Sequence, residues 1–150
     1  MSLTIELSVS DDVDDANLPS EENFQRWAQC CYTDDAEVVA SFQVVSSDEM
    51  KTLNKDYRGK DKPTNVLSFP MTLPEEVGIS ILGDLALCNE VIEAEARQQD
   101  KTSEAHWAHM IVHGMLHLLG YDHIEDNEAE TMETKEIEIM EKLGFDNPYQ

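Results

Sequence analysis

The sequence is poor in basic residues. Its 150 residues include 10 Lys and Arg against 32 Asp and Glu, which gives a formal net charge of −22 and a pI near 4.2. A chain this acidic lacks the broad positive face that a general nucleic-acid coat needs, and anionic membranes repel it. Any binding of nucleic acid must therefore depend on a local exception to the overall charge.

Long apolar runs and a cysteine framework are also missing. No apolar stretch approaches 18 residues, so no spanning helix is predicted, and the first 15 residues lack the basic start and apolar core of a signal peptide. The three cysteines, Cys30, Cys31 and Cys88, include no CxxC pair. They are predicted to be reduced thiols of a cytoplasmic protein, without a role in zinc binding.

Hydrophobic residues make up 41% of the chain and recur in periodic blocks. A chain of 150 residues is long enough to bury one core, so one domain is predicted. Alternation predicts strands over 3–9, 37–45, 66–69 and 79–88. Helical spacing predicts helices over 20–31, 46–57, 89–99 and 103–119, with Asn89 as the cap of the third, and a last helix that ends at 143. The interleaved order favours an α+β or mixed-sheet α/β domain.

The second predicted helix begins with a capping signal. Ser46 and Glu49 have the capping-box spacing. They precede Met50, Leu53 and Tyr57, and together these residues predict a short helix.

Histidines cluster in the second half of the chain, four of them within 106–117 and the fifth at 123. His113 and His117 are separated by four residues, so a helix places them side by side, as two ligands of one metal require. Gly120 can end the helix in a left-handed turn and bring back His123 as a third ligand. Three protein ligands leave one position of a tetrahedral zinc open, which is the catalytic arrangement, and the metal lowers the pKa of its bound water toward ~7.

The neighbours of this motif each allow two interpretations. His106 and His109 share a helix face and either line the approach to the metal or simply pack in the fold. Asp122 either orients a ligand histidine or caps a turn.

The same histidine spacing, H-x3-H-x2-G-x2-H, is found in metzincin proteases. Those enzymes carry a glutamate directly after the first histidine as the general base. This chain has Gly114 there. A metalloprotease is therefore the weaker alternative.

The few basic residues are concentrated in one segment. Residues 51–62 hold five of them against two acidic residues, a local net charge of +3. The segment is either a solvated surface or a phosphate-binding patch. Arg58 is the best candidate within it because a guanidinium can grip a phosphate with two hydrogen bonds. Lys55, Lys60 and Lys62 are candidate substrate-binding neighbours.

Three stretches carry a resemblance to a known family. They are LNKDYRGKDKPTNVLSFP at 53–70, LGDLALC at 82–88 and HMIVHGMLHLLGYDH at 109–123. On these motifs the chain resembles the YbeY family of bacterial metal-dependent endoribonucleases, also described as rRNA maturation factors. The resemblance implies a single α+β domain over 1–150, in which a small mixed four-stranded sheet is flanked by about five helices and the metal lies in a cleft.

The resemblance also implies roles for residues. Zinc, one ion per chain, is held by His113, His117 and His123, and an essential Arg58 lies close to it. Asn65 departs from the Asp that many members carry in this run, which puts a role for the position in doubt.

The activity implied is single-strand-specific RNA cleavage in 16S rRNA 3′-end maturation and ribosome quality control. We predict that zinc activates water or polarises a phosphate oxygen while Arg58 neutralises charge in the transition state; the nucleophile is either water or the RNA 2′-hydroxyl. The partners would be the 16S precursor, the small ribosomal subunit and its basic proteins. A non-catalytic ribosome assembly factor with a structural zinc is the alternative of a different class.

Overall fold

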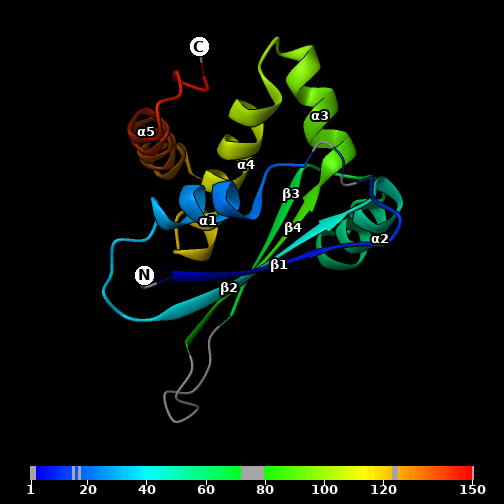
Figure 1. The fold of residues 1–150 in the computed structure, drawn as a ribbon, viewed down its shortest axis with the longest axis horizontal. Coiled ribbons are helices and arrows are strands. Elements are labelled where there is room, and N and C mark those ends of the chain that lie inside the picture. The colour runs from blue at the N-terminus through cyan, green and yellow to red at the C-terminus, as the bar shows by residue number, and fades with distance from the viewer. Residues whose placement is uncertain (1–2, 15, 17, 72–79, 123–124, 150) are drawn as a thin grey trace.

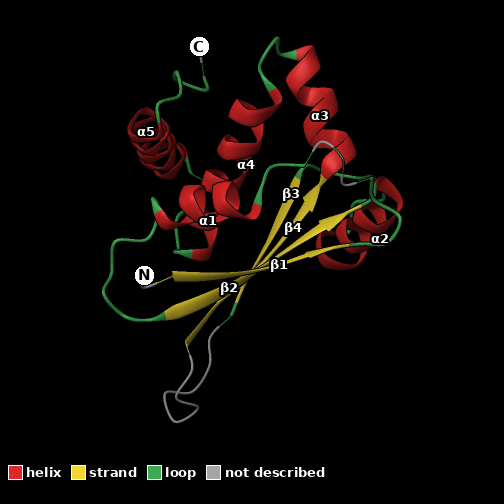
Figure 2. Ribbon diagram, in the orientation of Figure 1, coloured by secondary structure: helices red, strands yellow, loops and turns green. Residues whose placement is uncertain are grey.

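The computed structural model describes residues 3–14, 16, 18–71, 80–122 and 125–149. Within these residues the chain forms four strands and five helices (Figures 1 and 2). In chain order they are β1 (Leu3–Val9), α1 (Glu21–Gln29), β2 (Val38–Val45), α2 (Ser47–Arg58), β3 (Val66–Pro70), β4 (Ser80–Cys88), α3 (Asn89–Gln98), α4 (Ser103–Leu118) and α5 (Asp126–Leu143).

The strands form one mixed sheet in the order β1-β2-β4-β3. β1 pairs parallel to β2 and β2 parallel to β4, whereas β3 runs antiparallel to β4. The predicted α+β fold with a mixed four-stranded sheet and five helices is thus confirmed for the described residues.

Alternation along the strands sends side chains to two different cores. On β4, Leu85 and Leu87 belong to the larger core, which they share with α1, α4 and α5, whereas Ala86 and Cys88 belong to a smaller core beneath α2. Both faces of the sheet are therefore covered, and α2 and α4 approach the sheet from opposite sides (Figure 1).

Side chains cap the starts of α1, α2 and α4, whereas the N-cap residues of α3 and α5 make no side-chain hydrogen bond. The Ser46 hydroxyl accepts a hydrogen bond from the Glu49 backbone N–H at 3.2 Å, as the capping-box spacing predicts. The Asn89 prediction is wrong: Cys88 is the N-cap of α3, without a side-chain hydrogen bond, and Asn89 is the first helical residue. Strand β4 runs directly into α3, so the cap position falls on the last residue of the strand.

Two further expectations concern the membrane and the cysteines. No helix in the described part of the chain has the length and apolar character needed to cross a membrane. All three cysteines are free thiols, as predicted.

Candidate active site

The site is built on α4, which runs through the middle of the fold. This helix packs against α1, α3, α5 and the strands β3 and β4, so most of its residues are buried. A helix that is apolar nearly all round forms the core of a domain. Polar side chains on such a helix need partners, and its histidines have them.

His113 and His117 face each other from successive turns of α4. Their Nε2 atoms lie 3.2 Å apart. The Nδ1 atom of His113 lies 2.9 Å from the Glu136 carboxylate, and Nδ1 of His117 lies 3.0 Å from the Tyr121 carbonyl oxygen. Both of these oxygens only accept hydrogen bonds, so each Nδ1 carries the proton and donates it.

The turn after α4 positions the Tyr121 carbonyl. Gly120 has a φ of 101°, the left-handed conformation that glycine adopts without a steric penalty. The Gly120 N–H donates to the His117 carbonyl and the Tyr121 N–H to the Leu116 carbonyl, a Schellman motif. The glycine thus ends the helix, as predicted, and returns the chain to the His117 ring.

Glu136, on α5, is the centre of a buried network. Its Oε1 atom accepts hydrogen bonds from His109 Nε2 at 3.0 Å and from His113 Nδ1 at 2.9 Å, and its Oε2 accepts one from the Tyr149 hydroxyl at 2.6 Å. Burial raises the pKa of Glu136, but the hydrogen bonds from His109, His113 and Tyr149 outweigh it and lower the pKa to about 2. A buried carboxylate that stays ionised fixes the orientation of both histidine rings.

The residues present fit a metal ion. With both Nδ1 atoms protonated, the two Nε2 atoms direct lone pairs toward each other across 3.2 Å, an arrangement that suits a shared cation. Metal-binding histidines usually donate their other ring N–H to a carboxylate or a backbone carbonyl, as both do here. The predicted third ligand, His123, lies outside the described residues, and among the described ones no group of three or more potential ligands forms a complete site.

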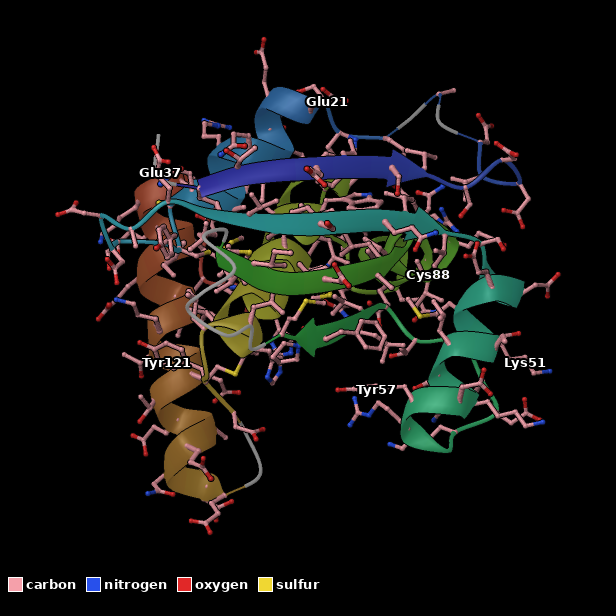
Figure 3. The ribbon with its side chains drawn as sticks, turned by 90° about the horizontal axis from the view of Figure 1, so that it is seen from below. Glu21, Glu37, Lys51, Tyr57, Cys88 and Tyr121 are labelled. Atoms are coloured by element: carbon pink, nitrogen blue, oxygen red, sulfur yellow. The ribbon has the colours of Figure 1, made fainter. Side chains whose placement is uncertain are left out.

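Arg58 and the two histidines line one cleft. Its volume is about 600 Å³. Arg58 is the last residue of α2, where Gly59, with a φ of 72°, ends the helix. Tyr57 of α2 also lines the cleft, and the other lining residues come from the loop before β3, from β3 itself and from the turn after α4: Thr64, Asn65, Val66, Leu67, Ser68, Pro70, Gly120, Tyr121 and Asp122. Figure 3 shows Tyr57 on the α2 side and Tyr121 on the α4 side, with β3 between them.

The cleft does not include every predicted residue. Asp122 lines it beside Tyr121. Lys55, Lys60 and Lys62 are exposed at the same end of α2 as Arg58 but are not among the residues that form the cleft walls.

The other two helix histidines are packing residues rather than part of the cleft wall. His106 and His109 are 2% and 7% exposed. His106 Nε2 lies 3.0 Å from Glu95, which also accepts a hydrogen bond from the Asn65 side-chain amide at 3.1 Å. Burial lowers the pKa of His106, although the hydrogen bond to Glu95 opposes the shift. The amide of Asn65 can donate to Glu95, which a carboxylate at this position could not do without a proton.

Gly114 faces the sheet instead of the cleft. A Cβ atom at this position would lie 2.9 Å from both Leu85 methyl groups and 3.2 Å from a Val66 methyl group. The backbone carbonyl of Gly114 also accepts a hydrogen bond from the Ser68 hydroxyl at 3.2 Å. A glutamate, as in metzincins, has no room here, so the packing of α4 itself opposes the protease alternative.

Sequence reasoning missed Glu136 and Tyr149. The signal for Glu136 is its position: it stands in the middle of the apolar face that Met132, Ile139 and Met140 form on α5, and all four residues are buried. A carboxylate in such a face needs buried donors. No comparable pattern marks Tyr149, which follows the last helix.

Replacing Glu136 by Gln is expected to remove an acid-sensitive part of the stability of the metal-free protein. In the unfolded chain the carboxyl takes up its proton near pH 4.5, whereas in the folded protein it does so near pH 2. The ionised carboxylate therefore contributes roughly 3 kcal/mol to the free energy of unfolding above about pH 5, and this contribution is lost as the pH falls toward 2. Urea unfolding at several pH values should show the free energy of unfolding falling more steeply for wild type than for Glu136→Gln. Glu141→Gln, an exposed change on the same helix, should keep the wild-type slope; equal slopes for wild type and Glu136→Gln would contradict the prediction.

Comparison with known proteins agrees with this description. The solution structure of TM1509 from Thermotoga maritima matches with a TM-score of 0.54 and 30% sequence identity, covering 94% of this chain and 92% of that one. A fold of this kind thus recurs in a second protein of nearly the same length. The model of the family described as endoribonuclease YbeY matches residues 9–144. The chain therefore belongs to the YbeY endoribonuclease family, whose name describes enzymes that cut RNA internally.

Proposed function

We propose that this protein is a zinc-dependent, single-strand-specific endoribonuclease that acts in 16S rRNA 3′-end maturation and in ribosome quality control. It would work in the cytoplasm as one metal-dependent hydrolase domain over residues 1–150. The observation that carries the proposal is the pair of Nε2 atoms of His113 and His117, 3.2 Å apart in a cleft that Arg58 also lines. Membership of an endoribonuclease family supports RNA as the substrate.

The roles of the residues follow from their contacts. His113, His117 and His123 would hold the zinc, which when bound supplies a Lewis acid at the scissile phosphate. The Glu136 carboxylate and the Tyr121 carbonyl hold the two described imidazoles with Nε2 directed at the cleft. Arg58, which lines the same cleft, would bind the phosphate and stabilise the charge that builds up in the transition state. Asp122 would orient the metal-binding turn from beside Tyr121.

The net charge of −22 supports delivery by partners. Most of the surface repels phosphate, so free RNA should bind weakly, and basic proteins of the small ribosomal subunit are suited to bring the enzyme to the 16S precursor. The exposed Lys55, Lys60 and Lys62 would attract the RNA backbone near the cleft.

The acidity of the chain also favours a second candidate, a non-catalytic assembly factor with a structural zinc. The two candidates can be distinguished in cells that lack the protein. Variants of the metal site should rescue rRNA processing if the protein is a non-catalytic assembly factor, and should fail to rescue it if the protein is a nuclease.

Removal of the metal tests the proposal directly. Protein stripped with a chelator is expected to lose RNA cleavage by about 100-fold or more and to regain it with one equivalent of zinc, since the Lewis acid lowers the barrier by several kcal/mol. Cleavage of a single-stranded RNA is measured beside a casein digest, which should show no hydrolysis in either state. Full RNA cleavage by protein shown to be metal-free would exclude the proposed mechanism.

A further inference from the structure

One aromatic side chain in the cleft is exposed without a structural reason. Tyr57 follows Met50 and Leu53 on α2, but it is 54% exposed, whereas Met50 is fully buried. The described large apolar residues exposed to this degree are Tyr57, Met71 and Tyr149. The hydroxyl of Tyr149 binds Glu136, but the Tyr57 hydroxyl has no hydrogen-bond partner in the described part of the chain.

Tyr57 is nevertheless held in place. Its ring centroid lies 4.5 Å from that of Phe69 on β3, with 60° between the ring planes. Phe69 itself packs on the smaller core beneath α2. One side of the Tyr57 ring is thus supported by the sheet while about half of the residue remains open to solvent. An aromatic ring that is rigid before its ligand arrives loses little conformational entropy on binding.

Tyr57 lies directly beside the phosphate-binding candidate. It precedes Arg58 at the end of α2, and both residues line the cleft that His113 and His117 also line. In a nucleotide, the phosphate and the base are joined through a single ribose. A strand whose phosphate meets Arg58 therefore carries a base within reach of the neighbouring ring.

We propose that Tyr57 is a stacking platform for one unpaired nucleobase of the RNA strand bound in the cleft. The proposal rests on the proposed function and deepens it by naming how the strand is held. Base–aromatic stacking tolerates any base because each base has a π-face, and its loss on substitution typically weakens binding by about 5- to 150-fold. A base inside a duplex has both faces covered by its neighbours, so the platform accepts a base only from a single strand.

Two substitutions separate stacking from packing. Tyr57→Phe keeps the ring and removes the hydroxyl. Tyr57→Leu keeps an apolar contact with Phe69 but has no flat π-face. Each variant is first compared with wild type by thermal unfolding. The probes are short single-stranded RNAs, either intact or with one abasic ribose placed at successive positions; binding is measured by fluorescence anisotropy with metal-free protein, and kcat/KM with zinc-loaded protein.

In wild type and Tyr57→Phe, one abasic position is expected to weaken binding by about 5- to 150-fold relative to intact RNA. In Tyr57→Leu that penalty should disappear, because the stacking partner is already absent. An abasic penalty of equal size in Tyr57→Leu and wild type overturns the inference, and so does the absence of any penalty in wild type. The anisotropy measurement does not depend on cleavage. If the protein shows the Tyr57-dependent penalty but cuts no RNA, the stacking platform stands and the proposed nuclease activity is refuted.

Discussion

Replacing His113 by alanine is expected to lower RNA cleavage by at least about 10³-fold and to abolish stoichiometric zinc binding. The imidazole is one of two whose Nε2 atoms meet in the cleft, and its removal leaves His117 without the facing nitrogen. Loss of the bound Lewis acid costs several kcal/mol of transition-state stabilisation, which corresponds to a rate change of this size. Metal content per chain and cleavage of a single-stranded RNA are measured on the same protein preparation.

His106→Gln is the matched control for this variant. His106 lies on the same helix and also has a carboxylate partner, Glu95, but it is buried and does not line the cleft. It should keep its zinc and most of its activity even where the protein is less stable. A His113→Ala protein that is folded and cuts RNA at the wild-type rate would refute the assignment of the site.

Replacing Arg58 by alanine is expected to lower kcat by about 10²- to 10³-fold while zinc content stays at the wild-type level. Arg58 lines the same cleft as the two histidines, and its guanidinium can donate two hydrogen bonds to a phosphate whose charge increases in the transition state. Arg58→Lys should recover only part of the loss, because an ammonium group cannot reproduce the two-bond geometry. Single-turnover cleavage with saturating protein reports the chemical step.

Lys60→Ala and Lys62→Ala are the controls for charge alone. Both lysines are exposed and neither forms the cleft wall. Each substitution should weaken RNA binding slightly and reduce its dependence on salt, with little change in single-turnover rate. If Arg58→Ala behaves like these two variants, the arginine contributes only to the surface potential.

Local signals in the sequence were sufficient for most of the fold. Serine caps and glycine ends depend on residues within one helical turn, so Ser46 and Gly120 could be interpreted correctly without tertiary information. The prediction for Asn89 is wrong because it relied on the capping preference of asparagine alone. Strand β4 runs directly into α3, and this places the N-cap on the neighbouring residue, Cys88. The strand order and the antiparallel direction of β3 depend on contacts between distant segments, which periodicity does not contain.

The candidate site was only partly visible in the sequence for the same reason. The four-residue spacing of His113 and His117 is a local property and predicts their meeting. That Arg58 shares a cleft with them depends on how α2 and α4 lie around β3, which no spacing specifies. That the ring of Tyr57, near the end of α2, packs on Phe69 of β3 and stays half exposed also depends on this arrangement, and helical spacing alone does not predict it.

The fit of Gly114 against the sheet also limits how this scaffold can diverge. The shared histidine spacing suggests that nuclease and peptidase are one substitution apart, from glycine to glutamate. A single Cβ already approaches the Leu85 and Val66 methyl groups to 2.9 and 3.2 Å, so a larger side chain requires these side chains to shift or to be replaced by smaller ones. A smaller residue introduced first would open a cavity in the core. The packing of α4 on the sheet, and not only the residue at position 114, therefore opposes that change.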